Sequence, residues 1–188
     1  MALAKPFTPA KLIVGVIAAE TPVFEKTESA LVSQYGPTDL RSAFFPFDAT
    51  DYYEPEMGVN LRRLFLSFSN LVPPDELGAI KVRTNALEDE IGRGHPALRR
   101  AVNIDPGILT GSALIMGTAK DFAHRVPLTR GIYAHLELLF KKNEARSLEW
   151  TYPDFRRQGY QDFFFEVRKL YLAQLRGTGA PGTWGTGE

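Results

Sequence analysis

Two different periods of hydrophobic and polar residues run along this chain, and they separate candidate strands from candidate helices. Residues 11–19 form a nearly continuous run of Val, Ile, Leu and Ala bounded by prolines, which is typical of a buried strand. Residues 21–35 instead place apolar side chains at helical spacing. This second segment begins with Thr21-Pro22 and stops at Gly36-Pro37, as helices do. The chain is therefore predicted to begin with a strand followed by a helix.

The same two periods predict three further strands, one helix and one loop before residue 105. They fall at residues 40–47, 61–68 and 99–104 for the strands, 73–92 for the helix and 48–58 for the loop. The order strand-helix-strand-strand-helix-strand is that of a ferredoxin-like βαββαβ core, in which both helices cover one face of an antiparallel sheet. We therefore predict an α+β fold with this core over residues 11–105.

The second half of the chain extends this core. Residues 108–119 fit either a short helix or a strand, and we predict the helix because their apolar side chains approximate one helical face. Residues 124–128 and 132–141 predict a β-hairpin that turns at Thr129-Arg130-Gly131.

The strongest helical pattern covers residues 153–176 and predicts a C-terminal helix. The side chains expected on its buried face are Tyr160, Phe163, Val167, Leu170, Tyr171 and either Gln174 or Leu175. The sequence shows no internal repeat and no boundary to a second domain, so residues 1–176 are expected to form a single α+β domain. Residues 177–188 are rich in glycine and are expected to be a flexible tail.

The amino-acid composition mainly excludes certain classes of site and partner. The 188 residues include 22 Lys and Arg, 22 Asp and Glu, and no Cys. Without cysteine the chain has no thiolate zinc finger, iron–sulfur cluster, thiolate nucleophile or disulfide scaffold. A net charge of zero argues against binding of duplex nucleic acid. No segment approaches the ~20 apolar residues of a membrane helix, so we expect no membrane association and a cytoplasmic location.

Lys120, His124 and Arg125 form the most suggestive polar group. Lysine and arginine bind phosphate or carboxylate groups, and histidine transfers protons near neutral pH. We therefore predict that Lys120 and Arg125 bind an anion and that His124 is a catalytic proton shuttle. Placement of Lys120 at a helix C-terminus is the alternative explanation.

Asp105 is the second predicted catalytic residue. It stands at the end of a predicted strand and before the turn-forming pair Pro106-Gly107. A carboxylate in that place is suited to act as a base or as a ligand of a cation. It is equally suited to cap the segment that follows.

The predicted loop at residues 48–58 carries four carboxylates within nine residues. Hard cations such as Mg²⁺ bind carboxylate oxygens, so Asp51 and Glu56 are candidate metal ligands. The spacing is not that of an EF-hand, and a solvated acidic loop is the alternative. Tyr52 and Tyr53 add aromatic surface of the kind found at binding sites.

Four polar and aromatic runs carry a resemblance to a known family. They are Thr50–Tyr53 with Glu56–Gly58, Asn103–Gly107, Lys120-Asp121 with His124-Arg125, and Trp150–Asp154. In these runs, and over about residues 9–175, the chain resembles the uncharacterised bacterial family catalogued as domain of unknown function 4416. The resemblance implies no activity, substrate or catalytic residues, because none is established for that family.

Some members of that family carry an automated label of GTP binding, which the residues of this chain do not support. A P-loop needs two glycines separated by four residues and followed directly by Lys and Ser or Thr. Here five residues separate Gly111 from Gly117, and Lys120 is displaced. The base-reading run Asn-Lys-x-Asp is also absent.

Two functions of different classes remain open, and so does the question of whether the chain is an enzyme. The first is an enzyme or binding protein for an anionic, phosphorylated small molecule, with Lys120, His124 and Arg125 at its site and a divalent cation as cofactor. The second is a non-catalytic interaction module, including a homodimer, that uses the loop at residues 50–58. The first requires the loop carboxylates and the Lys120 group to share one concave pocket.

Overall fold

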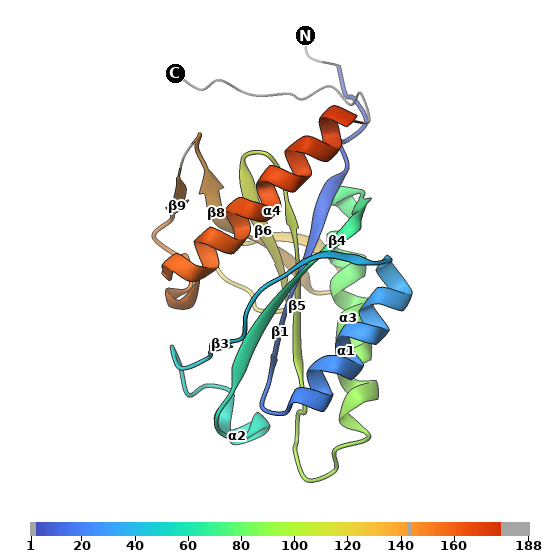
Figure 1. Cartoon of the computed structure of the whole chain (residues 1–188), viewed down its shortest axis with the longest axis vertical. Coiled ribbons are helices and arrows are strands. Elements are labelled where there is room, and N and C mark those ends of the chain that lie inside the picture. Colours follow the sequence, from blue (N-terminus) through green and yellow to red (C-terminus); the bar gives the residue numbers. More distant parts are fainter. Residues whose placement is uncertain (1–2, 143, 178–188) are drawn as a thin grey trace.

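The computed structural model describes residues 3–142 and 144–177, and these residues build a nine-stranded antiparallel sheet (Figure 1). The strands are β1 (Ala10–Ala18), β2 (Thr38–Arg41), β3 (Phe45–Pro46), β4 (Arg62–Val72), β5 (Asn103–Leu109), β6 (Ala113–Thr118), β7 (Val126–Thr129), β8 (Ile132–Phe140) and β9 (Ala145–Ser147). The helices are α1 (Thr21–Tyr35), α2 (Glu54–Met57), α3 (Leu77–Gly92) and α4 (Gln158–Gly177), with 3₁₀ turns η1 (Pro74–Glu76) and η2 (Pro153–Arg156). The predicted tail lies outside the described residues from residue 178 onward.

The strands follow the order β2-β4-β1-β5-β6-β8-β7, with β3 paired to β4 and β9 paired to β8. β1 is central, and its residue Val14 lies opposite Leu66 of β4 on one side and Pro106 of β5 on the other. The α+β class is confirmed. The sheet is larger than the predicted four-stranded core, because β6 to β9 continue it past β5.

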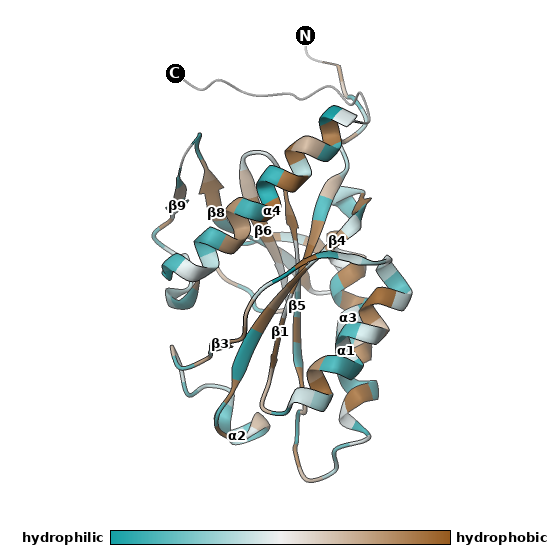
Figure 2. Cartoon of the chain, viewed as in Figure 1, coloured by the Kyte–Doolittle hydropathy of each residue, from teal (hydrophilic) through white to brown (hydrophobic). Residues whose placement is uncertain are grey.

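Helices cover both faces of the sheet, which explains the continuous apolar sequence of β1. Alternate side chains such as Val14 and Val16 pack against α1 and α3, whereas Ile13 packs with Phe65 on the face covered by α4. Figure 1 shows α4 crossing the sheet on the side away from α1 and α3. In Figure 2 the central strands carry long hydrophobic stretches, while the helices alternate in colour around their axes.

The helix predicted at residues 108–119 is wrong. These residues form the end of β5, a tight turn and β6. The turn is closed by Thr110, whose Oγ1 accepts hydrogen bonds from the backbone N–H groups of Ser112 and Ala113. Because both faces of the sheet are covered here, the strands are apolar throughout and show no period of two.

Three other predicted boundaries also shift. The strand predicted at residues 99–104 begins only at Asn103, and the strand predicted at residues 40–47 is divided into β2 and β3. The loop predicted at residues 48–58 contains the short helix α2. The hairpin of β7 and β8 is confirmed, with Arg130 and Gly131 at φ 48° and 75° in its turn.

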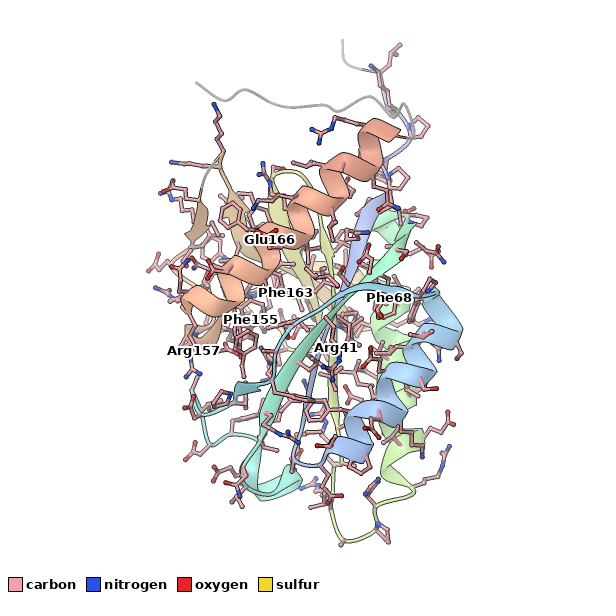
Figure 3. The ribbon with its side chains drawn as sticks, viewed as in Figure 1. Arg41, Phe68, Phe155, Arg157, Phe163 and Glu166 are labelled. Atoms are coloured by element: carbon pink, nitrogen blue, oxygen red, sulfur yellow. The ribbon has the colours of Figure 1, made fainter. Side chains whose placement is uncertain are left out.

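The C-terminal helix is confirmed, and Tyr160, Phe163, Val167 and Tyr171 are buried as predicted. The prediction that Leu170 is buried is wrong, because 41% of its surface is exposed. Phe164 is buried instead. Figure 3 places Phe155 and Phe163 between α4 and the sheet. In the described ranges, no helix is long and apolar enough to span a bilayer.

Candidate functional site

A cavity of about 1100 Å³ opens at one end of the sheet. Its walls come from the loop at residues 47–56, the second half of α3, the segment at 99–105, the end of β6 and the segment at 152–155. The antiparallel pairing brings the beginnings of β4, β5 and β8 to the end of the sheet where β1 and β6 finish. Segments far apart in the sequence therefore converge on one space.

This cavity collects some of the predicted site residues and leaves others outside its lining. Asp105, Lys120 and Glu56 line it, so one loop carboxylate does share a pocket with Lys120. His124 and Arg125 are not among the lining residues, although both contact side chains that are. Asp51 does not line the cavity.

Asp105 lies against two cations at the inner wall. Its Oδ1 is 3.3 Å from Lys81 Nζ and its Oδ2 is 3.6 Å from Arg63 Nη2, and Asn103 Nδ2 donates to Oδ2 at 2.5 Å. Burial by itself would raise the pKa of Asp105, but Lys81 and Arg63 outweigh it and the pKa is lowered. A carboxylate held in this way is ionised and only weakly basic, so its pairing with the two cations accounts for its position better than proton abstraction does.

The deep cations of the cavity all have carboxylate partners. Arg63 is only 5% exposed and donates from Nη1 to Asp154 Oδ2 at 2.7 Å. Lys81 donates to the carbonyl oxygen of Ile104 at 2.6 Å and lies 3.7 Å from Glu88 Oε1. Arg100 pairs with the other oxygen of Glu88. These charges balance one another within the protein.

Lys120 differs from these cations. Its Nζ lies 4.2 Å from the ring centroid of Tyr52 and 5.6 Å from that of Tyr53, a cation–π arrangement. Among the residues that the structure describes, no carboxylate oxygen lies within 4 Å of this ammonium group. Burial lowers the pKa of Lys120 and the neighbouring Arg125 adds to this shift, whereas the charge of Asp105 opposes it. The cavity thus contains an exposed cation with no carboxylate within 4 Å among the described residues.

Arg125 lies behind the cavity wall and hydrogen-bonds to residues that line the cavity. Its guanidinium donates from Nη1 to the backbone oxygen of Lys120 at 2.7 Å, from Nη2 to the hydroxyl of Tyr152 at 2.6 Å and from Nε to Nδ1 of His135 at 3.1 Å. All three acceptors belong to residues that line the cavity, whereas Arg125 itself does not. One side chain therefore fixes the relative positions of three lining residues.

Sequence reasoning missed the buried pair of His135 and Glu137 behind this wall. His135 is 1% exposed, and its Nε2 lies 2.8 Å from Oε2 of the fully buried Glu137, whose other oxygen accepts the backbone N–H of Tyr152 at 2.7 Å. An arginine Nε always donates, so Nδ1 of His135 is the acceptor of the hydrogen bond from Arg125. Two polar side chains at positions i and i+2 of an otherwise apolar strand were the available signal.

His124 lies at the outer end of this chain of contacts. Its Nε2 is 3.1 Å from Nδ1 of His135, and its ring stacks on Trp150 with centroids 4.9 Å apart and planes 9° from parallel. Burial lowers the pKa of His124, and the proximity of His135 and Arg125 lowers it further. The imidazole is therefore biased toward its neutral form.

The metal-binding hypothesis gains no geometric support. Within residues 3–142 and 144–177, no group of three or more His, Asp or Glu side chains is placed to hold a metal ion. Glu56 Oε1 instead lies 3.5 Å from Arg99 Nη1. A metal role of Asp51 and Glu56 stays a prediction from the sequence.

A family model described as a domain of unknown function (DUF4416) matches residues 8–171. The chain belongs to this family. No curated protein matches the chain. The segments that form the cavity, from residue 47 to residue 155, all fall inside the DUF4416 match. The site is therefore part of the DUF4416 region of the chain.

Proposed function

We propose that this chain binds an anionic small molecule, such as a phosphorylated compound, in the cavity, with Lys120 as the direct charged contact. The observation that carries the proposal is the contrast between Lys120, which is exposed, and the more deeply placed cations of the same cavity. Arg63, Lys81 and Arg100 are paired with carboxylates, whereas Lys120 has none within 4 Å among the described residues. Lys120 itself is exposed and lines the cavity, so its ammonium group is open to an incoming anion.

Aromatic side chains support a ligand with a flat or apolar part. Phe47, Tyr52, Tyr53 and Tyr152 line the same cavity as Lys120. Pockets that combine apolar walls with a few placed polar groups are typical of small-molecule sites. The proposal concerns binding, and it assigns no reaction to His124 or Asp105.

The test is calorimetric titration with inorganic phosphate and phenyl phosphate, combined with thermal unfolding. A charge-assisted contact contributes about 1.5–3 kcal/mol, so Lys120→Ala should weaken binding roughly 10- to 100-fold. Lys169→Ala is the matched control, because Lys169 is exposed on α4 and pairs with Glu166 at 2.6 Å. Absence of binding by the wild type, or equal binding by both variants, would contradict the proposal.

Protein interaction through the loop at residues 50–58 is the second candidate. Tyr52 within the loop is 62% exposed and Val59, the residue directly after it, is 63% exposed, which favours this candidate. Tyr53, however, packs against Phe47 with ring centroids 5.7 Å apart and lines the cavity. Sedimentation of the wild type and of Tyr52→Ser over a range of concentrations tests self-association directly.

The strand order also supports a structural proposal. β2-β4-β1-β5 with α1 and α3 on one face is the arrangement expected of a ferredoxin-like βαββαβ core. We propose that β6 to β9 and α4 are additions to that core. The cavity lies where the core and the additions meet, since β5 and β6 both contribute to it.

A further inference from the structure

We infer that the hydroxyl of Tyr152 is a direct hydrogen-bond donor to the bound anion, and that Arg125 is a positioning residue that acts through Tyr152 and Lys120. This inference rests on the proposed function and changes the role predicted for Arg125. The sequence suggested that Arg125 touches the anion itself. The geometry places it one layer behind the residues that line the cavity.

The hydroxyl of Tyr152 has its accepting side occupied and its proton free for a ligand. Its oxygen accepts from Nη2 of Arg125 at 2.6 Å, and in the described part of the chain it donates to no protein acceptor. The ring is held in place by stacking on His135, with centroids 5.1 Å apart and planes 21° from parallel. Burial raises the pKa of Tyr152, so this hydroxyl keeps its proton at neutral pH.

Arg125 makes this hydroxyl a stronger donor than an isolated tyrosine. A cationic donor at the oxygen polarises the O–H bond, as happens in chains of hydrogen bonds in a low-dielectric interior. Arg125 is itself oriented by Nδ1 of His135, behind which Glu137 lies fully buried. A series of side-chain contacts therefore leads from the protein interior to the cavity, through Glu137, His135, Arg125 and Tyr152.

The same guanidinium also fixes the backbone of Lys120. Nη1 and Nη2 belong to one planar fork, so the Lys120 carbonyl and the Tyr152 hydroxyl are held by adjacent nitrogens. An ammonium group and a neutral hydroxyl from neighbouring parts of the wall suit an oxyanion with at least two oxygens. Phosphate monoesters and carboxylates are the ligand classes with this chemistry.

The first test is Tyr152→Phe, titrated with phenyl phosphate by calorimetry. The substitution keeps the stacked ring and removes only the hydroxyl, so affinity should fall roughly 10- to 100-fold. Thermal stability without ligand should stay close to that of the wild type. Tyr35→Phe is the matched control, because the hydroxyl of Tyr35 accepts from Nε of Arg83 at 3.4 Å outside this cavity. Its affinity should be unchanged.

The second test separates positioning from direct contact. Arg125→Gln is measured in the wild-type background and in the Tyr152→Phe background. If Arg125 acts through Tyr152, the loss of affinity should be clearly smaller in the second background. If the two losses multiply fully, Arg125 does not act through Tyr152 and this inference is overturned. Should Arg125→Gln fail to fold, Arg125→Lys, which keeps the charge, replaces it in the same cycle.

The outcomes distinguish this inference from the proposed function. If the wild type binds neither inorganic phosphate nor phenyl phosphate, the proposed function fails and this inference fails with it. If the wild type and Tyr152→Phe bind phenyl phosphate equally, only this inference fails. If Tyr152→Phe weakens binding, Tyr35→Phe does not, and the loss caused by Arg125→Gln is smaller in the Tyr152→Phe background, both stand.

Discussion

Arg63 on β4 donates from Nη1 to Oδ2 of Asp154 in η2 over 2.7 Å, and both side chains are almost completely buried. The guanidinium carbon also lies 4.8 Å from the ring centroid of Phe47 and 5.4 Å from that of Phe155. The pair therefore ties the segment that begins α4 to the sheet at the inner wall of the cavity.

We predict that Arg63→Met destabilises the protein by about 3–5 kcal/mol, because it leaves Asp154 buried without its cation. The double variant Arg63→Met/Asp154→Asn should regain part of that loss, since it removes the uncompensated charge. Urea unfolding of both variants measures the free energies. A double variant less stable than Arg63→Met would contradict this account of the pair.

Phe163 and Leu170 on α4 provide a matched comparison of burial. Phe163 is 8% exposed and stacks on Phe65 with ring centroids 5.8 Å apart, whereas Leu170 is 41% exposed. Phe163→Ala should cost about 3–5 kcal/mol of unfolding free energy, and Leu170→Ala less than about 1 kcal/mol. Equal costs would mean that α4 packs with a different face.

Two glycines should respond to alanine in opposite directions. A Cβ on Gly107 would lie 2.4 Å from Sδ of Met116 and 2.9 Å from the backbone oxygen of Ile115, so β5 and β6 would have to separate. A Cβ on Gly92, at the end of α3, would meet no atom within 4 Å. Gly107→Ala should therefore lower the melting temperature, while Gly92→Ala should raise stability by about 0.4–1 kcal/mol.

The stability of the protein should fall below about pH 6.5 partly because of His124. An unfolded histidine has a pKa of about 6.5, and the pKa of His124 is lowered in the folded protein by burial, His135 and Arg125. Between these two values the unfolded chain binds more protons, so acidification favours unfolding. His124→Gln should lose less stability than the wild type between pH 7.5 and pH 5.5 in urea unfolding.

The sequence predicted elements with one covered face better than elements covered on both. α1, α3 and α4 each have an exposed side, so helical spacing was visible. The segment at residues 108–119 lies in a sheet covered on both faces, where Leu109, Ala113 and Met116 happen to fall at helical intervals. Pro106 and Gly107 were predicted to form a turn, but they lie within β5. They pair there with β1 and β6, which are distant in the sequence, and the local sequence does not show this pairing.

The sequence predicted only some residues of the candidate site, for a similar reason. Lys120 follows β6, and Asp105 was predicted to end a strand although it lies within β5; both line the cavity. His135, Glu137 and Arg63 lie inside strands whose apolar neighbours suggested simple packing. Their role in the cavity depends on partners that are far away in the sequence, as Asp154 is for Arg63. The pattern of hydrophobic and polar residues along the chain does not show such pairings.

The cavity draws its lining from the middle of the chain alone. Among the described residues, β1, α1, β2 and α4 contribute no lining side chain, although they supply much of the hydrophobic interior. Under the proposed function, substitutions in β1, α1 or α4 can therefore adapt the protein to a new temperature without replacing any residue that meets the ligand. A new ligand preference would have to arise between residues 47 and 155, where cavity residues such as Arg63 and Asp154 also stabilise the fold.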